Sequence, residues 1–372
     1  MGFLADAALT DRILDHVAAG TTDLSEGVWR EPVEHYLAPE RLRAEVHGVL
    51  RRRFIALCPS AALPDAGSYL ARTAAGVPLV ATRGRDDQVR VFRNSCRHRG
   101  TAVASDSGCA TALVCPYHGW VYGLDGALRH VPDEYGFPGL DRASHGLVEV
   151  RAVERAGLVF AAQDEPHAGE GALAELPDLV GAGQKLYDHG ERILEANWKV
   201  LLEGFLEGYH IKATHRQTFF PFGYDNINVI ETYGPHSRVT FPFRRIEALR
   251  EVPRPQRDLD SLVTVVYHLF PNVIVARLSH HTSVVVLEPE APDRTRMVTY
   301  QLAKPSASEA AIRDAKFVEQ GTAEDREMAR AVQRGLASGA NDVLTFGRFE
   351  GAIAHLHRQL TALLPAVDGG SR

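Results

Sequence analysis

The spacing of hydrophobic residues changes along the chain and marks out its elements. In residues 1–53 apolar side chains recur at helical intervals on either side of a polar loop at 20–23. From residue 54 to residue 163 the pattern changes to short β-branched runs, such as 77–82 and 89–94, separated by Gly, Asp and Arg turns. The pattern predicts helices near the N-terminus, followed by a small all-β domain.

The second half of the chain mixes strand-like and helix-like patterns. A Gly-, Ala- and Pro-rich stretch at 164–183 indicates a connecting loop. A helix is predicted from about Asn197, strands follow between 227 and 304, and two helices are predicted at about 307–337 and 342–364. Strands followed by helices are typical of an α+β domain.

Composition narrows the class of protein. The 372 residues are enough for about two domains. A net charge of −6 does not suggest a nucleic-acid or anionic-membrane surface. No apolar run could span a bilayer, and the N-terminus lacks the pattern of a signal peptide. Four cysteines argue against a disulfide scaffold and for the cytoplasm. One arginine cluster is interpreted as a solvated helix face, with a partner-docking surface as the alternative: Arg41, Arg43, Arg51, Arg52 and Arg53.

Two cysteines and two histidines form the most specific motif. Cys96 and His98 make a C-x-H pair, and sixteen residues separate it from Cys115 and His118, which make a C-x-x-H pair. A Rieske-type [2Fe–2S] cluster takes two thiolates on one iron and two imidazoles on the other. Each pair supplies one ligand of each kind, and this stoichiometry predicts such a cluster.

A Cys₂His₂ zinc site is the alternative for the same four side chains. The single-residue C-x-H spacing is unusual for a zinc finger, and the motif lies among predicted strands. The other two cysteines, Cys58 and Cys109, are predicted to be small buried residues rather than ligands.

His210 and His215 are candidate ligands of a second metal. Ferrous iron that activates O₂ is typically held by two histidines and one carboxylate, with coordination positions left open. Residues five apart on a regular helix point about 140° apart, so the helix must widen or end between the two, and a π-bulge is one way to do so. Glu207 precedes His210 by three residues, on the same predicted helical face, where it could hydrogen-bond a ligand imidazole.

Asp325 is the candidate third ligand. At about 100° per residue it falls within the apolar stripe that includes Met328 and Val332, whereas Glu324 and Glu327 fall off it. A carboxylate on a core-facing stripe is costly unless it is paired or binds a metal. The alternative is an exposed acid favoured by the helix dipole.

Both constellations carry a family resemblance. The segments "CRHRG…CPYHGW", "EGFLEGYHIKATH" and "ED…VQ" resemble the oxygenase (alpha) component of Rieske non-heme iron oxygenases, the aromatic-ring-hydroxylating dioxygenase alpha-subunit family, over about residues 30–360. The resemblance implies an α+β protein. It implies an all-β Rieske domain at 54–163 and a helix-grip (START/Bet v1-like) catalytic domain with an antiparallel sheet, made of residues 1–53 and 164–372.

The resemblance also implies the activity. The cluster passes electrons to a mononuclear Fe(II), and O₂ is used to hydroxylate or oxidatively demethylate a small organic substrate, by monooxygenation or dioxygenation. The chain has no dinucleotide fingerprint, so a separate NAD(P)H-dependent reductase or ferredoxin is expected to supply electrons. Family members of this kind are commonly homotrimers, in which the acid matching Glu207 bridges to a cluster histidine, here His118, of a neighbouring subunit.

The substrate is less defined than the reaction. The phrases "EGFLEGYH" and "AVQRGL" are similar to oxygenases of methylated or quaternary amines, which need an aromatic cage or an acid. Gly204 stands where the family often has Asn. The substrate position known from other family members therefore cannot be transferred directly to this chain. An electron-transfer protein without oxygenase chemistry is the alternative function, and the intact candidate triad argues against it. Candidate pocket residues are Leu201, Phe205, Phe219, Phe222, Tyr224, Phe241, Phe243 and Phe270.

Overall fold

The computed structural model divides the chain into two compact units. It describes residues 3–166, 171–174, 176–181 and 183–364. One unit is Met1–Leu50 with Gly181–Arg372, and the other is Arg51–Val180. No helix in the described part of the chain combines the length and apolar character that a membrane span requires.

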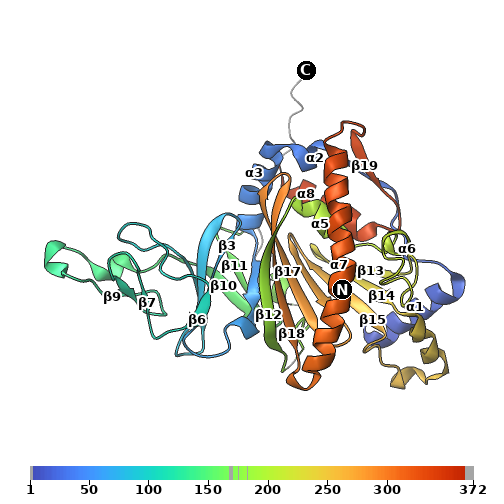
Figure 1. Ribbon diagram of the computed structural model, residues 1–372, viewed down its shortest axis with the longest axis horizontal. Coiled ribbons are helices and arrows are strands. Elements are labelled where there is room, and N and C mark those ends of the chain that lie inside the picture. The colour runs from blue at the N-terminus through green and yellow to red at the C-terminus, as the bar shows by residue number, and fades with distance from the viewer. Residues whose placement is uncertain (1–2, 167–170, 175, 182, 365–372) are drawn as a thin grey trace. The chain divides into compact units, whose positions relative to one another are not determined.

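The unit Arg51–Val180 is built on antiparallel strands. Its seven-stranded sheet has the order β2-β11-β10-β5-β4-β3-β6, and a three-stranded sheet has the order β7-β8-β9 (Figure 1). The strands are β2 (Ile55–Pro59), β3 (Ser68–Ala74), β4 (Val77–Arg83), β5 (Val89–Arg93), β6 (Ser107–Cys109), β7 (Leu113–Val114), β8 (Val121–Tyr122), β9 (Leu128–His130), β10 (Glu149–Arg155) and β11 (Leu158–Ala162). The short helical elements are η2 (Ser60–Ala62), η3 (Glu134–Gly136), η4 (Arg142–His145) and α4 (Gly171–Ala174). The prediction that this part of the chain is built of β-strands is confirmed.

A hydrophobic core joins the two sheets of this unit to the cysteine loops. Val80 and Phe92 from the larger sheet cluster with Tyr122 from the smaller one, and Cys96 and Cys115 belong to the same cluster. Both cysteines are therefore held by packed core rather than by mobile surface.

The larger unit is one sheet with helices around it. Seven antiparallel strands have the order β12-β18-β17-β16-β15-β14-β13, so six follow in sequence and the first returns to the far edge. They are β12 (Lys185–Leu194), β13 (Val229–Tyr233), β14 (His236–Pro242), β15 (Val263–Leu269), β16 (Val273–Arg277), β17 (Thr282–Ala291) and β18 (Arg294–Ala303). The helices are α1 (Asp6–Ala19), α2 (Glu34–Leu37), α3 (Pro39–Gly48), α5 (Trp198–Glu203), α6 (Ile211–Thr214), α7 (Ser308–Leu336) and α8 (Gly351–Leu363), with short turns η5 (Arg244–Glu251), η6 (Arg254–Gln256) and η7 (Pro305–Ala307).

The long helix α7 runs across this sheet (Figure 1). Ala329 and Leu336 are buried in the main core, whereas Met328 and Val332 are 46% and 42% exposed and line a cavity. The stripe predicted to face the core therefore faces a cavity over part of its width. An open wall of this kind is what a helix must offer if a ligand is to bind against it.

Two elements differ from the sequence prediction. The helix expected at 342–364 begins only at Gly351, because β19 (Val343–Phe346) pairs antiparallel with β1 (Trp29–Pro32). The strand β12 had no predicted counterpart, since its polar residues alternate poorly and its partner β18 lies over 100 residues later. In the predicted connector, residues 167–170, 175 and 182 lie outside the described residues.

A buried ion cluster ties α3 to α5 within the larger unit. The Glu45 carboxylate accepts hydrogen bonds from Arg41 Nε at 2.9 Å, from Lys199 Nζ at 2.8 Å and from Trp198 Nε1 at 2.9 Å. Arg41 is only 4% exposed, so its assignment to a solvated face is wrong. Two cations and one carboxylate can be buried together here because the carboxylate accepts hydrogen bonds from both cations.

We expect Glu45→Gln to destabilise the larger unit by about 3–5 kcal/mol, because it leaves two buried cations without their counter-ion. Urea unfolding followed by tryptophan fluorescence measures this, since Trp198 contacts the site. The matched control is Glu40→Gln on the same helix, whose partner Arg43 is 64% exposed. An unfolding midpoint equally shifted in both variants would contradict the assignment.

Candidate metal centres and cavity

A single helical turn presents the two candidate histidines. The helix α5 ends at Glu203, an irregular stretch follows, and α6 covers only Ile211–Thr214. His210 is the N-cap of α6 and His215 is its C-cap, with His215 leaving helical geometry at φ −100° and ψ 36°. The chain therefore ends the helix rather than widening it, and the two rings come to a centroid distance of 5.0 Å.

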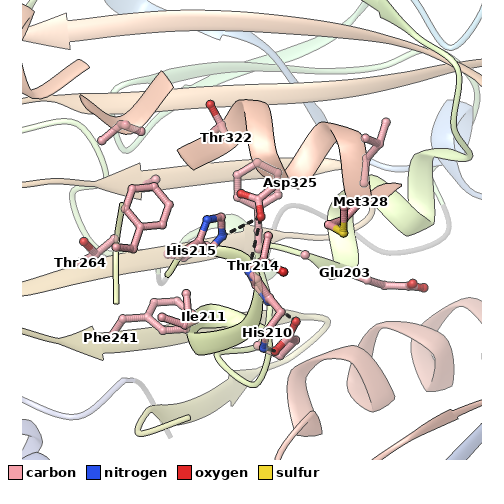
Figure 2. A pocket seen from close by; sticks show the side chains of 18 of the residues that line it. Glu203, His210, Ile211, Thr214, His215, Phe241, Thr264, Thr322, Asp325 and Met328 are labelled. Carbon is pink, nitrogen blue, oxygen red and sulfur yellow. Dashed lines mark hydrogen bonds and ion pairs between the residues drawn. The ribbon is translucent and has the colours of Figure 1, made fainter. Parts of the chain in front are cut away.

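Asp325 reaches the same point from α7. Its Oδ1 lies 2.8 Å from His215 Nε2 and 3.5 Å from His210 Nε2. Figure 2 shows the three side chains pointing toward one another at the cavity. In the described part of the chain, this is the one group of three or more His, Cys, Asp or Glu side chains whose donor atoms lie within 4.8 Å of one another.

The geometry of this triad fits a metal ion. His215 Nε2 is buried and makes no hydrogen bond, although it lies so close to Asp325. Burial lowers the pKa of His210, but its contacts with Asp325 and Glu207 outweigh burial and raise that pKa to about 10. Burial raises the pKa of Asp325, whereas the two histidines lower it more. The site thus has a strong preference for added positive charge, which a divalent ion supplies.

Two further carboxylates fix the orientation of the rings. Glu207 contacts His210 Nδ1 and also accepts the backbone N–H groups of Tyr209 and His210. Glu324 Oε2 lies 2.8 Å from His215 Nδ1 and accepts from Thr218 Oγ1 at 2.7 Å. Both rings therefore turn Nε2 toward Asp325.

These contacts correct one sequence expectation and add one residue that the sequence did not single out. Glu207 lies in the irregular stretch, not on a helical face shared with His210. Glu324 lies off the predicted apolar stripe and is not a third ligand, yet its carboxylate holds the His215 ring in place. Its signal in the sequence was its position beside Asp325, since a ligand histidine needs an acceptor for its second nitrogen.

A cavity of about 580 Å³ opens beside the triad, between the sheet and α7. Phe219, Phe222, Phe241 and Phe243 contribute to a largely apolar wall. The structure also places Leu201, Phe205 and Tyr224 in the lining, together with Phe317 and Phe346, which the sequence did not single out.

Phe270 is a correction to the expected lining. It is 3% exposed, belongs to the main core cluster and does not line the cavity. It directly follows strand β15, which ends at Leu269, and its side chain packs in the core. Residue type alone does not make this distinction. At Gly204, a Cβ would meet no atom nearer than 3.8 Å, so the missing side chain leaves free space in the cavity wall.

The four Cys and His residues of the other unit lie on two similar loops. The N–H of Gly100 donates to the carbonyl of Cys96 at 2.9 Å, and that of Gly119 to the carbonyl of Cys115 at 3.0 Å. Both glycines have positive φ, 83° and 71°, which allows these tight turns. The rings of His98 and His118 lie 4.6 Å apart.

The donor atoms of this quartet fit a cluster better than a single ion. A tetrahedral zinc would bring all four donors within about 4 Å of one another, but no three of them lie within 4.8 Å. Cys96 and Cys115 are 3% and 2% exposed, and the buried Nδ1 of His98 has no hydrogen-bond partner. Wider spacing is what two bridged irons require.

The remaining cysteines behave differently from each other. Cys58 is fully buried, as predicted, and burial raises the pKa of its thiol to about 12. Cys109 is exposed, so the prediction that it is buried is wrong. It ends β6, an edge strand whose whole length is exposed.

Comparison with known proteins agrees with this geometry. Residues 176–366 match the model of the ring hydroxylating alpha subunit (catalytic domain), and residues 53–141 match that of the Rieske [2Fe-2S] domain. The chain is 30% identical over 224 residues to the glycine betaine monooxygenase oxygenase subunit of Chromohalobacter salexigens, covering 58% of this chain and 50% of that one. It is 32% identical over 197 residues to the carnitine monooxygenase oxygenase subunit of Escherichia coli, covering 50% and 52%. The chain thus spans about half the length of the curated relatives it matches.

Solved structures share the fold. The quaternary ammonium Rieske monooxygenase CntA in complex with L-carnitine superposes with a TM-score of 0.77 at 21% identity, covering 98% of this chain and 100% of that one. Naphthalene 1,2-dioxygenase from Rhodococcus sp. bound to indole gives a TM-score of 0.74 at 18% identity, covering 96% and 99%. The predicted α+β fold, an all-β unit and an antiparallel sheet with helices, is confirmed.

Substitutions in and around the triad should weaken iron binding to different degrees. We expect Asp325→Asn to abolish binding of Fe(II) at this site, and Glu324→Gln to weaken it by about 10–100-fold because His215 loses its oriented acceptor. Metal titration of protein freed of this iron measures both. Glu327→Gln, an exposed acid on the same helix, is the control, and equal affinity in all three variants would contradict the site.

The contact between the Tyr122 hydroxyl and Cys96 Sγ should affect the reduction potential of the cluster. The hydroxyl accepts from the N–H of Arg97 at 2.9 Å and lies 3.3 Å from Cys96 Sγ, so its proton is available to the sulfur. Removing a hydrogen bond to a ligand sulfur disfavours the reduced cluster. We expect Tyr122→Phe to lower the midpoint potential in a redox titration, whereas Tyr135→Phe, 88% exposed, leaves it unchanged. An unaltered potential in Tyr122→Phe would refute the bond.

Proposed function

Because this chain belongs to the family of ring-hydroxylating alpha subunits and contains a Rieske domain, we propose that it is the oxygenase component of a Rieske non-heme iron oxygenase. The observation that supports this best is the convergence of His210, His215 and Asp325 beside a largely apolar cavity. For a monooxygenation, the substrate C–H, O₂, two electrons and two protons give C–OH and water. A dioxygenation places both oxygen atoms in the product.

The candidate residues form two metal centres with different roles. Cys96, His98, Cys115 and His118 hold the [2Fe–2S] cluster, and the triad holds Fe(II). When bound, the cluster supplies electrons one at a time and the iron supplies the place where O₂ is reduced. The surrounding aromatic side chains exclude water and position the substrate near the triad.

Glu207 is the proposed link between the centres. It already contacts His210 Nδ1, and its side chain is 11% exposed. We assign it the bridge from His210 to His118 of a neighbouring subunit in a homotrimer. The structure of a quaternary ammonium Rieske monooxygenase has been described in terms of inter-subunit electron transfer, which supports this assignment.

The proposed substrate is a methylated or quaternary amine. Relatives that act on glycine betaine and carnitine support this class, and the phenylalanine-rich wall can bind a cation through ring faces. A small aromatic compound is the second candidate, supported by the likeness to naphthalene 1,2-dioxygenase.

The electron donor and the cellular compartment are also proposed, from the sequence and from the family. Electrons come from a separate NAD(P)H-dependent reductase or ferredoxin, and the protein works in the cytoplasm. The division into a cluster domain at 54–163 and a catalytic domain formed by the remainder stays a prediction. A Rieske electron carrier without oxygenase chemistry is disfavoured by the metal triad, for which a carrier has no use.

His210→Ala separates the oxygenase from the electron carrier. We expect iron to fall from about three to about two atoms per chain while the cluster's visible spectrum persists. Incorporation of ¹⁸O from ¹⁸O₂ into a tested amine, with reductase present, should stop in the variant. Labelled product formed at the wild-type rate would exclude this iron site.

A further inference from the structure

A chain of buried ionisable side chains runs through the larger unit to the cavity. Glu203, in the cavity wall, accepts through Oε1 from Tyr36 Oη at 2.6 Å and pairs with His357 Nε2 at 2.8 Å. His357 Nδ1 lies 3.3 Å from Glu31 Oε1, and the same oxygen lies 2.6 Å from His35 Nδ1. Successive groups along this path, from His35 to Glu203, are therefore separated by 3.3 Å or less.

The path has one end near the surface and the other at the cavity. His35 has a side chain 21% exposed, whereas His357 and Glu31 are 0% and 2% exposed in their side chains. Glu203 is 10% exposed, and Figure 2 labels it among the side chains around the cavity. Its Oε2 accepts no hydrogen bond from the described residues. That oxygen can therefore bond to water in the cavity.

Stability alone does not account for these residues. Well-packed apolar residues of similar volume often replace a buried ion pair without loss of stability. Here two carboxylates and an imidazole lie in the main core region, beside Trp29, which donates to Glu31. Every member of the path, in contrast to an apolar residue, can accept and release a proton.

The charges around the path favour the protonated form of His357. Burial lowers the pKa of His357, but Glu203 and Glu31 outweigh it and raise the pKa. Burial raises the pKa of Glu31, while the hydrogen bond with His35 and the close contact with His357 hold it well below its usual range. The His357 ring thus lies between two carboxylates, with Nε2 on Glu203 and Nδ1 facing Glu31.

Two other charged groups face this path. The Glu45 cluster on α3 and α5 is balanced by its own cations, Lys199 and Arg41. Glu350, just before α8, lines the cavity, and burial with the charges of Glu207 and Glu203 raises its pKa to about 7. Neither group interrupts the contacts between His35 and Glu203.

We propose that Glu203 delivers protons to the cavity and is reloaded through His357, Glu31 and His35. This rests on the proposed oxygenase function, in which two protons accompany the two electrons from the reductase. His357 passes its Nε2 proton to Glu203, and Glu203 passes a proton to cavity water and so to the oxygen atom that leaves as water. Glu31 and His35 return the ring to its protonated form from the outer side. Tyr36 is a positioning residue that holds the Glu203 carboxylate in place.

Glu203→Gln tests the delivery step. Gln keeps the size and the acceptor oxygen but carries no transferable proton, so we expect normal folding and iron content with a turnover lowered by about 10²–10⁴-fold. The substrate KM should stay within about twofold, and the solvent deuterium isotope effect should increase. In Glu203→Ala, added formate should restore part of the rate, because a small acid can replace the missing carboxyl group.

Glu290→Gln is the matched control. Glu290, on β17, does not line the cavity and pairs with Arg294 and Arg296 of β18, away from the path. We expect wild-type turnover and isotope effect in this variant. Equal turnover in Glu203→Gln and the wild type, or a loss in Glu203→Ala that formate does not relieve, would overturn the proposal.

Neutron diffraction of the intact protein gives a readout independent of turnover. At neutral pH we expect deuterium on both ring nitrogens of His357, and a ring carrying one deuterium would show that no proton is stored there. Absence of oxygenation in the wild type would instead refute the proposed function, so the two failures can be told apart.

Discussion

Two histidines and an aspartate more than 100 residues later must meet at one point, and this requirement organises the larger unit. Two histidines five residues apart cannot face one ion from a regular helix. The chain meets the requirement with a single turn, α6, whose ends are the histidines themselves. Such a short helix has little stability of its own, so it depends on neighbouring carboxylates and on α7, which supplies both Asp325 and Glu324.

The same requirement explains the electrostatics around the cavity. Each histidine has one nitrogen on a carboxylate and the other toward Asp325, so the ring orientations are set before a metal binds. Three acids, Glu207, Glu324 and Asp325, thus surround two imidazoles in a poorly hydrated place. That arrangement favours the binding of a cation. Burial raises the pKa of nearby Glu350 to about 7, and the charge of Glu207 adds to this shift.

The sequence predicted the local chemistry better than the long-range contacts. The Cys and His spacings, the need to end a helix between His210 and His215, and the position of Asp325 on its helix could all be derived from periodicity and ligand chemistry. Glu324 could not, because its role depends on where α7 approaches α6. The pairing of β1 with β19 was missed for a related reason, since strand partners over 300 residues apart leave little local signal. Phe270 and Arg41 show that residue type does not tell the core from the cavity or the surface.

The central claim is that one chain holds two iron centres, the second of them at His210, His215 and Asp325. Anomalous diffraction at the iron absorption edge tests it most directly, because the signal locates iron without reference to activity. We predict two separate peaks in each chain, a stronger one bonded to Cys96, His98, Cys115 and His118 and a weaker one bonded to the triad. A structure with iron at the cluster and no iron at the triad, or with zinc at either position, would contradict the account.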